Sequence, residues 1–224
     1  MNTIAIIPSG GVGSRFNSPI PKQYVKVLGK ELICYTLNVF QNCKLIDEII
    51  IPANESYFDL LNQIKIDNNF SKISKIIKGG EVRQDSVYNG LSSKNFKYDD
   101  TIIVHDAARP LISDTLLESA LLKSKKSDSL VVAIKARDTL IKSDKSIIDH
   151  LDRSDIYYVQ TPQIFKYNVL KKAFELAIEN NFYGTDESML VTNAGFEVEI
   201  FDGEFKNFKI TTKSDIETFE KLIK

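Results

Sequence analysis

This 224-residue sequence has two cysteines, almost no net charge and no long hydrophobic run. Cys34 and Cys43 are too few for a disulfide scaffold or a cysteine-rich metal cluster, and both fall in a predicted helix, so we expect buried free thiols. The 29 basic and 30 acidic residues give a net charge of −1, which creates no global field to attract nucleic acid or an anionic membrane. Cations that bind phosphate would therefore have to be gathered locally.

The sequence also lacks the signals of a membrane or exported protein. No apolar run approaches the roughly 20 residues needed to span a bilayer. The N-terminus has neither a basic n-region nor an apolar h-region, so the expectation is a cytoplasmic protein. Hydrophobic residues make up 43% of the chain, which is enough for a substantial core in one α/β domain or two small ones.

Short apolar runs alternate along the chain with longer amphipathic segments. The short runs predict strands at 4–7, 48–52, 73–77, 101–104, 130–134, 197–201 and 208–211. Helical spacing and capping residues predict helices at 31–43, 54–66, 85–91, 113–125, 166–179, 186–194 and 213–223. This order predicts an α/β protein with a Rossmann-like, open and mostly parallel sheet and helices on both faces.

The stretch 135–160 interrupts this alternation. Two partly alternating runs, 139–142 and 147–151, flank the polar residues 143–146 and predict an extended β-hairpin. An isolated hairpin is marginally stable in water, so this one must pack on its own domain or on another subunit. We therefore interpret residues 1–224 as a single domain with an arm at about 136–160.

The first predicted strand runs into a glycine-rich loop followed by two cations. These residues are Ser9, Gly10, Gly11, Gly13, Arg15 and Lys22. Glycines let the backbone turn tightly and approach a ligand closely, and successive N–H groups can bind an anion, so the loop suits a polyphosphate. It lacks the Gly-Lys-Ser/Thr of a P-loop, and Phe16 replaces the third glycine of the dinucleotide fingerprint. For the loop alone, a plain strand-to-helix turn remains the alternative.

Other polar residues collect where predicted strands end, which is where open α/β sheets bind ligands. Asp106 directly follows a buried strand and is a candidate Mg²⁺ ligand against triphosphate oxygens, with a helix cap or a partner of Arg109 as the alternative. His105 is expected to be a hydrogen-bonded structural residue. Taken singly, Glu81, Arg153 and Lys209 fit solvated surface charges and Ser86 fits a helix cap.

Several segments together resemble the 2-C-methyl-D-erythritol 4-phosphate cytidylyltransferase family. They read GGVGSRF with PKQY, GGEVRQDSVYNGL, VHDAARPL, ARDTL, DR followed by QTPQIF, GTDES and NFKITT, in family order over nearly the full length. The resemblance implies a nucleotide-diphospho-sugar transferase-like fold. It also implies transfer of CMP from CTP to a polyol phosphate, with Mg²⁺ and release of pyrophosphate, by a homodimer joined through the arm.

The resemblance assigns roles residue by residue. Arg15 and Lys22 match the cations that stabilise the charged transition state, and Arg153 and Lys209 match those that hold the acceptor's phosphate. The positions matching the CTP side are Ser9, Gly10, Gly11 and Gly13 in the loop, Gly80, Glu81 and Ser86 around cytosine and ribose, and Asp106 near the metal. The further acceptor positions are Arg109, Thr185 and Asp186, together with Thr139, which the arm offers to the neighbouring subunit.

Three alternatives stay open. The loop begins Ser9-Gly10-Gly11 where the family usually has Ala-Ala-Gly, so a related enzyme of another polyol phosphate such as ribitol 5-phosphate is the nearest. A dinucleotide-binding oxidoreductase is disfavoured because no acidic residue ends the second predicted strand. A nucleotide sensor without turnover is disfavoured because cations match both the CTP and the acceptor sides.

Overall fold

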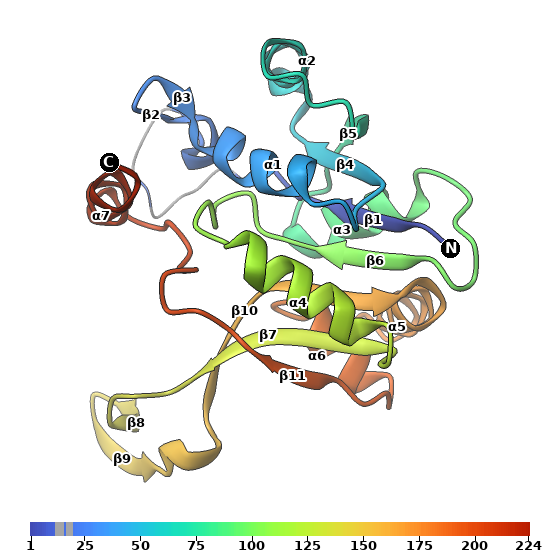
Figure 1. Ribbon diagram of the computed structural model, residues 1–224. Helices are drawn as coiled ribbons and strands as arrows, with labels where there is room; N and C mark the ends of the chain where they lie inside the picture. Colours follow the sequence, from blue (N-terminus) through green and yellow to red (C-terminus); the bar gives the residue numbers. More distant parts are fainter. Residues whose placement is uncertain (12–15, 17–19) are drawn as a thin grey trace.

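The computed structural model describes residues 1–11, 16 and 20–224. The main strands are β1 (Thr3–Ile6), β4 (Glu48–Ala53), β5 (Ile73–Lys78), β6 (Thr101–Val104), β7 (Ser129–Lys135), β10 (Tyr157–Lys166) and β11 (Glu199–Asp202). They form one seven-stranded sheet in the order β11-β7-β10-β6-β1-β4-β5 (Figure 1). The α-helices are α1 (Leu32–Asn42), α2 (Phe58–Asp67), α3 (Arg83–Ser92), α4 (Asp114–Ser124), α5 (Tyr167–Glu179), α6 (Glu187–Asn193) and α7 (Lys213–Ile223).

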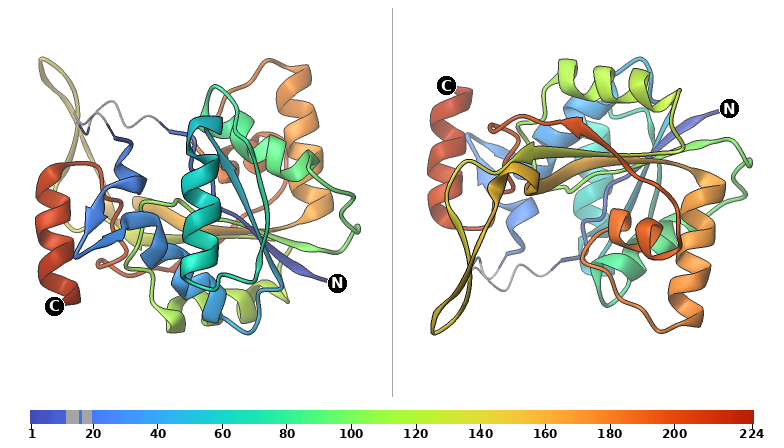
Figure 2. Two further views of the ribbon diagram at one scale, coloured as in Figure 1. Left: turned by 90° about the horizontal axis from the view of Figure 1, so that it is seen from above. Right: turned by 90° about the horizontal axis from the view of Figure 1, so that it is seen from below.

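Helices cover both faces of the sheet, as Figure 2 shows from above and below. Consecutive residues of β1 point to opposite faces: Ala5 packs in the cluster with α1, α2 and α4, whereas Ile4 and Ile6 pack in the cluster with α3, α5 and α6. A strand buried on both faces needs an unbroken apolar sequence, which is why these short runs are predictive. The prediction of a Rossmann-like, mostly parallel α/β sheet is confirmed. Cys34 and Cys43 are buried free thiols, also as predicted.

The chain changes direction across the sheet at β1. Strand β1 is parallel to β4 on one side and to β6 on the other, while the chain visits β4 and β5 before it crosses back to β6. The loops after β1 and β6 therefore diverge and leave a crevice at the carboxyl edge of the sheet. Within the described residues, no helix has both the length and the apolar character needed to cross a membrane.

Strand β10 is not among the strands that the sequence predicts, and it is antiparallel to both of its neighbours, β6 and β7. Its central position is unexpected because Pro162 cannot donate a ladder hydrogen bond. The register against β7 shifts between Val159 and Gln163, so the proline lies at an irregularity where no ladder bond is required. Because β10 runs in reverse, its first residues lie at the same edge as the carboxyl ends of β6 and β7.

The predicted hairpin is confirmed. Strands β8 (Leu140–Asp144) and β9 (Ser146–Leu151) pair antiparallel around Lys145, which adopts a positive φ of 66°. This pair leaves the sheet between the end of β7 and the start of β10 and projects away from the body of the protein (Figure 1). We call residues 136–156 the arm. Every residue of β9 is exposed to solvent.

The strand predicted at 208–211 is wrong, because this segment is irregular. It makes one sheet-like contact, from Ile210 N to Ala108 O at 2.8 Å, and Ile210 is buried against Phe219 of α7. The predicted helix 54–66 also begins late. Asn54 caps a 3-10 turn at Glu55–Tyr57, and α2 follows this turn.

Candidate active site

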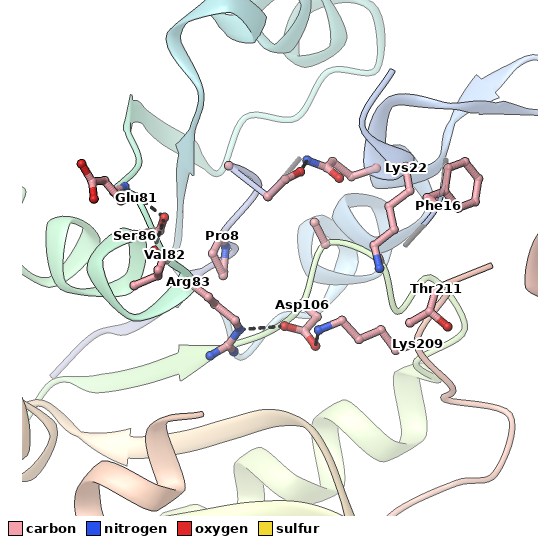
Figure 3. Close-up of a pocket in the computed structure, with 16 residues that line it drawn as sticks. Pro8, Phe16, Lys22, Glu81, Val82, Arg83, Ser86, Asp106, Lys209 and Thr211 are labelled. Carbon is pink, nitrogen blue, oxygen red and sulfur yellow. Dashed lines mark hydrogen bonds and ion pairs between the residues drawn. The ribbon is translucent and has the colours of Figure 1, made fainter. Parts of the chain in front are cut away.

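A cavity of about 350 Å³ lies at the carboxyl edge of the sheet, where β1 and β6 diverge (Figure 3). Its walls come from the loop after β1, the loop into α3, the loop after β6, and the segment before α7. The predicted site residues that line it are Gly10, Gly11, Lys22, Gly80, Glu81, Ser86, Asp106 and Lys209. Residues distant in sequence thus meet at the position expected for a ligand site in an open α/β sheet.

The start of the glycine loop is held from behind by Gln23 and Tyr24. Gln23 Nε2 donates to Ser9 O at 2.7 Å and to Gly11 O at 2.9 Å, and Tyr24 OH donates to Ser9 O at 3.0 Å. Because that phenol proton is committed, the Ser9 hydroxyl must donate to Tyr24 OH, 2.8 Å away. Burial raises the pKa of Tyr24 to about 12, so it remains a donor at neutral pH. Ser9 therefore supports the loop behind the cavity wall.

The turn that precedes α3 is closed by Ser86. Its hydroxyl accepts from Gly80 N at 3.0 Å and donates to Val82 O at 3.1 Å, so Ser86 organises the turn from inside the helix. A Cβ on Gly80 would lie 2.1 Å from the Cβ of Asp85, so a larger residue would push this turn apart. A Cβ on Gly11, by contrast, would meet no described atom within 4 Å.

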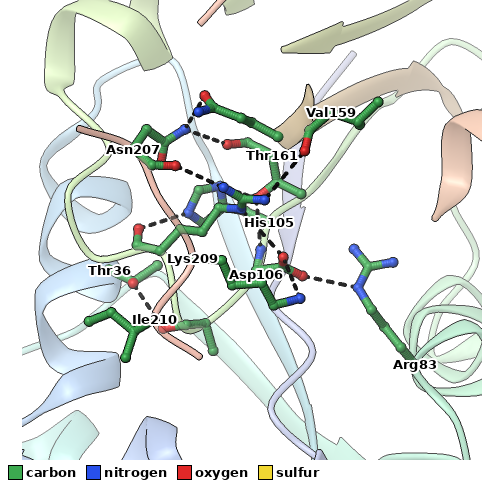
Figure 4. A network of polar contacts seen from close by, with 12 residues as sticks. Thr36, Arg83, His105, Asp106, Val159, Thr161, Asn207, Lys209 and Ile210 are labelled. Carbon is green, nitrogen blue, oxygen red and sulfur yellow. Dashed lines mark hydrogen bonds and ion pairs between the residues drawn. The ribbon is translucent and has the colours of Figure 1, made fainter. Parts of the chain in front are cut away.

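Asp106 is the centre of the site, and three cations surround its carboxylate (Figure 4). Arg83 Nε lies 3.0 Å from Oδ1, Lys209 Nζ 2.9 Å from Oδ2, and Arg109 Nε 3.5 Å from Oδ2. Burial alone would raise the pKa of Asp106, but these cations hold it well below its ordinary value. The carboxylate is therefore ionised at neutral pH. The ion pair with Arg109, given above as an alternative role for Asp106, is also present.

His105 lies directly behind Asp106 and fixes the backbone of the loop. His105 Nε2 lies 3.2 Å from Arg109 O, and a carbonyl oxygen can only accept, so Nε2 carries the ring proton. Nδ1 of the neutral ring is then an acceptor, and Thr161 Oγ1 donates to it at 3.1 Å while accepting from Asp106 N at 3.1 Å. Burial lowers the pKa of His105 to about 3, so the ring is neutral. The structural role predicted for His105 is confirmed.

Arg109 connects Asp106 to the segment that carries Lys209. Its Nη1 donates to Asn207 O at 2.8 Å, and Asn207 Nδ2 in turn donates to Thr161 O at 2.9 Å. Arg109 is therefore part of the support behind Asp106. Lys22 reaches the cavity from the opposite side, and its ammonium donates to Ile210 O at 2.6 Å (Figure 3).

Six predicted residues are not among the described residues that line the cavity. Ser9 and Arg109 support it from behind, and the other four lie farther away. Thr139 and Arg153 are exposed on the arm, where Arg153 Nη1 donates to Arg137 O. Thr185 is exposed, and Asp186 caps α6 by accepting from Met189 N at 2.9 Å. Gly13 and Arg15 lie outside the described residues.

Sequence reasoning missed several residues that build the site, namely Gln23, Tyr24, Arg83, Thr161, Glu187 and Asn207. All of them belong to the segments quoted for the family resemblance, which is the signal that could have found them. Their contacts join segments far apart in sequence, so spacing alone could not reveal their partners.

The donor set fits Mg²⁺ bound together with a polyphosphate. Among residues 1–11, 16 and 20–224, no three His, Cys, Asp or Glu side chains are grouped as a metal cage would need. Asp106 supplies an ionised carboxylate to the cavity, and Glu81 is the other acidic residue among the described residues that line it. Mg²⁺ commonly takes one or two carboxylates and fills its remaining positions with phosphate oxygens and water.

Comparison with known proteins identifies the family. The family model described as 2-C-methyl-D-erythritol 4-phosphate cytidylyltransferase matches residues 3–224. The chain belongs to this family. A cytidylyltransferase with that name from Clostridioides difficile (strain 630) is 37% identical over 219 residues, covering 97% of this chain and 92% of the relative.

Solved structures of the family share the fold. The 2-C-methyl-D-erythritol 4-phosphate cytidylyltransferase of Francisella tularensis superposes with a TM-score of 0.83 at 33% identity, covering 98% of each chain. A 4-diphosphocytidyl-2C-methyl-D-erythritol synthase from Anaerococcus prevotii DSM 20548 gives a TM-score of 0.86 at 26% identity, covering 99% of this chain and 96% of the other. The similarity thus extends over nearly the whole chain.

Proposed function

We propose that this protein is a nucleotidyltransferase that transfers CMP from CTP to 2-C-methyl-D-erythritol 4-phosphate and releases pyrophosphate, a reaction of isoprenoid precursor synthesis. The observation that carries the proposal is the cavity at the carboxyl edge, where glycine backbone, Lys22, Lys209 and an ionised Asp106 converge. Family membership over residues 3–224 supports the same activity.

CTP would lie along the glycine loop. Gly10 and Gly11 would approach the triphosphate, and Arg15 and Gly13 belong to the same loop by sequence. Gly80, Glu81 and Ser86 would form the wall beside ribose and cytosine. Lys22 projects into the cavity and would offset the charge that develops on the α-phosphate and on the leaving pyrophosphate, which is the main form of catalysis available to such transfers.

The acceptor would bind beside Asp106 and Lys209. An oxygen of its phosphate attacks the α-phosphorus of CTP, a new phosphoanhydride bond forms, and the bond to the β-phosphate breaks as pyrophosphate takes the electron pair. An ionised phosphate oxygen is already a nucleophile, so no general base is required. Arg109, Thr185 and Asp186 would complete the acceptor side, and positioning of the two reactants can supply roughly 7–11 kcal/mol at the upper end.

Asp106 would hold Mg²⁺ together with the triphosphate. Lys209 contacts Oδ2 of Asp106, so we expect it to move to the acceptor's phosphate when the metal–nucleotide complex binds. When bound, the ion would neutralise part of the charge on the phosphates. Removal of Mg²⁺ with a chelator should abolish pyrophosphate release, and added Mg²⁺ should restore it.

The arm would join two copies into a homodimer and place Thr139 and Arg153 in the partner's site. Four apolar side chains of the arm are 41–59% exposed in a single copy, namely Ile141, Ile147, Ile148 and Leu151. Exposed apolar clusters of this kind usually mark a contact surface. An isolated hairpin also needs a surface to pack against. Sedimentation velocity of the purified protein tests the dimer directly.

The decisive experiment measures pyrophosphate release from CTP and Mg²⁺ with methylerythritol 4-phosphate, beside ribitol 5-phosphate. We expect release with the first acceptor. Release with ribitol 5-phosphate alone would move the protein to polyol metabolism and leave the chemistry unchanged.

Lys22→Ala should lower kcat at least about 100-fold, because it removes a cation that stabilises the transition state. The matched control is Lys26→Ala, a nearby lysine whose side chain is 68% exposed and paired with Glu31. Near-full activity of the Lys22 variant would show that the catalytic role is misassigned.

A further inference from the structure

Arg83 joins two acidic side chains at the back of the cavity. Its Nε donates to Asp106 Oδ1 at 3.0 Å, and its Nη1 donates to both carboxylate oxygens of Glu187 at 2.7 and 2.9 Å. Glu187 is 1% exposed and does not line the cavity, whereas Asp106 does. The proposed reaction gives neither Arg83 nor Glu187 a task.

The geometry divides the two oxygens of Asp106 between two environments. Oδ1 faces Arg83 at the wall, and Oδ2 faces Lys209 and the part of the cavity where the acceptor would bind (Figure 4). A guanidinium is a rigid fork, so a fork that is anchored on Glu187 through Nη1 also fixes the direction of its Nε–H. This Nε–H is the donor that contacts Oδ1 of Asp106, while Nη2 has no hydrogen-bond partner among the described residues.

We propose that Arg83 is a positioning residue, anchored by Glu187, which holds Asp106 so that its second oxygen faces Lys209 and the bound substrates. The anchor comes from α6 and the donor from the first residue of α3, so two elements on one face of the sheet set the orientation of a side chain after β6. This inference rests on the proposed function, because it assigns Asp106 a role toward substrates.

Glu187 also limits the positive charge beside the cavity. Three cations, Arg83, Arg109 and Lys209, face two carboxylates, Asp106 and Glu187. Without Glu187, Arg83 would be balanced by Asp106 alone and would compete more strongly with Lys209 for it. The anchor therefore leaves Asp106 available to the side of the cavity where ligands bind.

A purely structural ion pair is the competing explanation, and substitution of both partners separates the two. Replacing a buried ion pair by apolar residues of similar size often preserves stability, whereas removal of one partner leaves a buried charge unpaired. Arg83→Met with Glu187→Met should therefore fold. It would still remove the donor that orients Asp106. The matched control is Lys94→Met with Glu48→Met, a second ion pair whose lysine is also 26% exposed and which does not line the cavity.

The measurements are kcat and KM for the acceptor, the Kd for CTP without Mg²⁺, and the unfolding temperature of each variant. We expect the Arg83→Met/Glu187→Met protein to unfold cooperatively and to bind Mg²⁺-free CTP within about threefold of the parent, while kcat/KM for the acceptor falls about 30-fold or more. Arg83→Lys, which keeps the charge but loses the fork, should show the same selective loss. If the double variant does not fold, Arg83→Lys still distinguishes a positioning role of Arg83 from a purely structural one.

Two results would overturn the assignment. One is acceptor kcat/KM within about threefold of the parent in Arg83→Lys or in the double methionine variant. The other is a parallel loss of acceptor turnover and of CTP binding measured without Mg²⁺, which would mean that the pair only maintains the cavity. The parent's own transfer rate tests the proposed function separately. An inactive parent removes that function and this inference with it, whereas an active parent with active variants removes only the inference.

Discussion

The cavity edge and the arm use charged residues in opposite ways. At the edge, Asp106 is buried and each carboxylate oxygen has a cation within 3.0 Å, so its orientation is fixed inside one copy of the chain. On the arm, Arg153 and Thr139 are exposed, and β9 has no buried residue. At the edge, described residues of one copy already pair the charge of Asp106, whereas the arm has polar and apolar groups that a single copy leaves in contact with water.

Substitutions in these two regions should therefore affect stability and activity differently. A change at the edge disturbs a buried network and should alter stability and chemistry together. A change on the arm should leave the sheet intact and alter only what depends on a second copy. The following substitutions test that separation.

The largest effect is expected for Asp106→Asn, because three cations would face a neutral amide. Activity should fall about 1000-fold or more. The free energy of unfolding should fall by about 3–5 kcal/mol, because the carboxylate that all three buried cations contact would be lost. Denaturant titration and the pyrophosphate assay measure the two effects. Asp149→Asn on the exposed arm is the control and should change neither quantity.

Removal of the arm should lower acceptor turnover and leave the free energy of unfolding nearly unchanged. Replacing residues 137–155 with Asn-Gly leaves a two-residue loop between Ala136 and Ile156, which keeps the Ala136 N to Ile156 O contact and suits this type of turn. We expect a monomer whose acceptor turnover falls about 100-fold, while CTP still binds and the unfolding free energy changes by about 1 kcal/mol or less. A fully active monomer would refute the proposal that the arm completes the partner's site.

A single arm cation should give a smaller version of the same result. Arg153→Ala should raise KM or lower kcat for the acceptor by a combined factor of about 10 to 100. The Kd for CTP should stay at the parent value, because Arg153 is not among the described residues that line the cavity. Lys145→Asn at the hairpin tip, where φ is 66°, is the control. Equal loss in both variants would mean that the arm responds to net charge alone.

The smallest effect concerns His105, which belongs to the support behind the edge. Its pKa is lowered to about 3 in the folded protein from 6.5. In the window between these values the unfolded chain binds the proton and the folded protein does not, so stability falls as pH falls below about 6.5. Between pH 7 and 5.5 the parent should lose about 1 kcal/mol more than His105→Gln. Parallel stability curves for the two proteins would contradict the buried neutral histidine.

Most of the sheet was predictable, because strands that are buried on both faces require short apolar runs. Residues 4–7, 48–52 and 101–104 carry such runs, and all three predicted strands are present, with Ile7 bonded just beyond β1. β10 was missed because its proline argues against a central strand, and only the register shift at Val159 and Gln163 makes room for it. The segment 208–211 has a strand-like composition, but its position is set by Ala108 and Phe219.

Site residues were predictable where the chemistry requires a particular residue type at the end of a strand. They were not predictable where their role depends on a contact with a residue far away in sequence. Glycines after β1, Lys22 and Asp106 indicate a phosphate site by type and position. Arg83 and Glu187 are 104 residues apart, and each would pass for an ordinary surface charge until the fold brings them together. A position near the end of a strand is visible in a sequence, whereas a contact across two helices is not.

The hydrogen bonds from Gln23 and Tyr24 to the glycine loop also affect how the loop meets an anion. Backbone carbonyl oxygens repel phosphate oxygens, and a flexible glycine loop can turn them toward a ligand as easily as its N–H groups. The carbonyls of Ser9 and Gly11 are already engaged by Gln23 Nε2. At the described start of the loop, two carbonyl oxygens are therefore already hydrogen-bonded when an anion arrives, so the side-chain amide of Gln23 helps to decide the sign of the charge that the cavity admits.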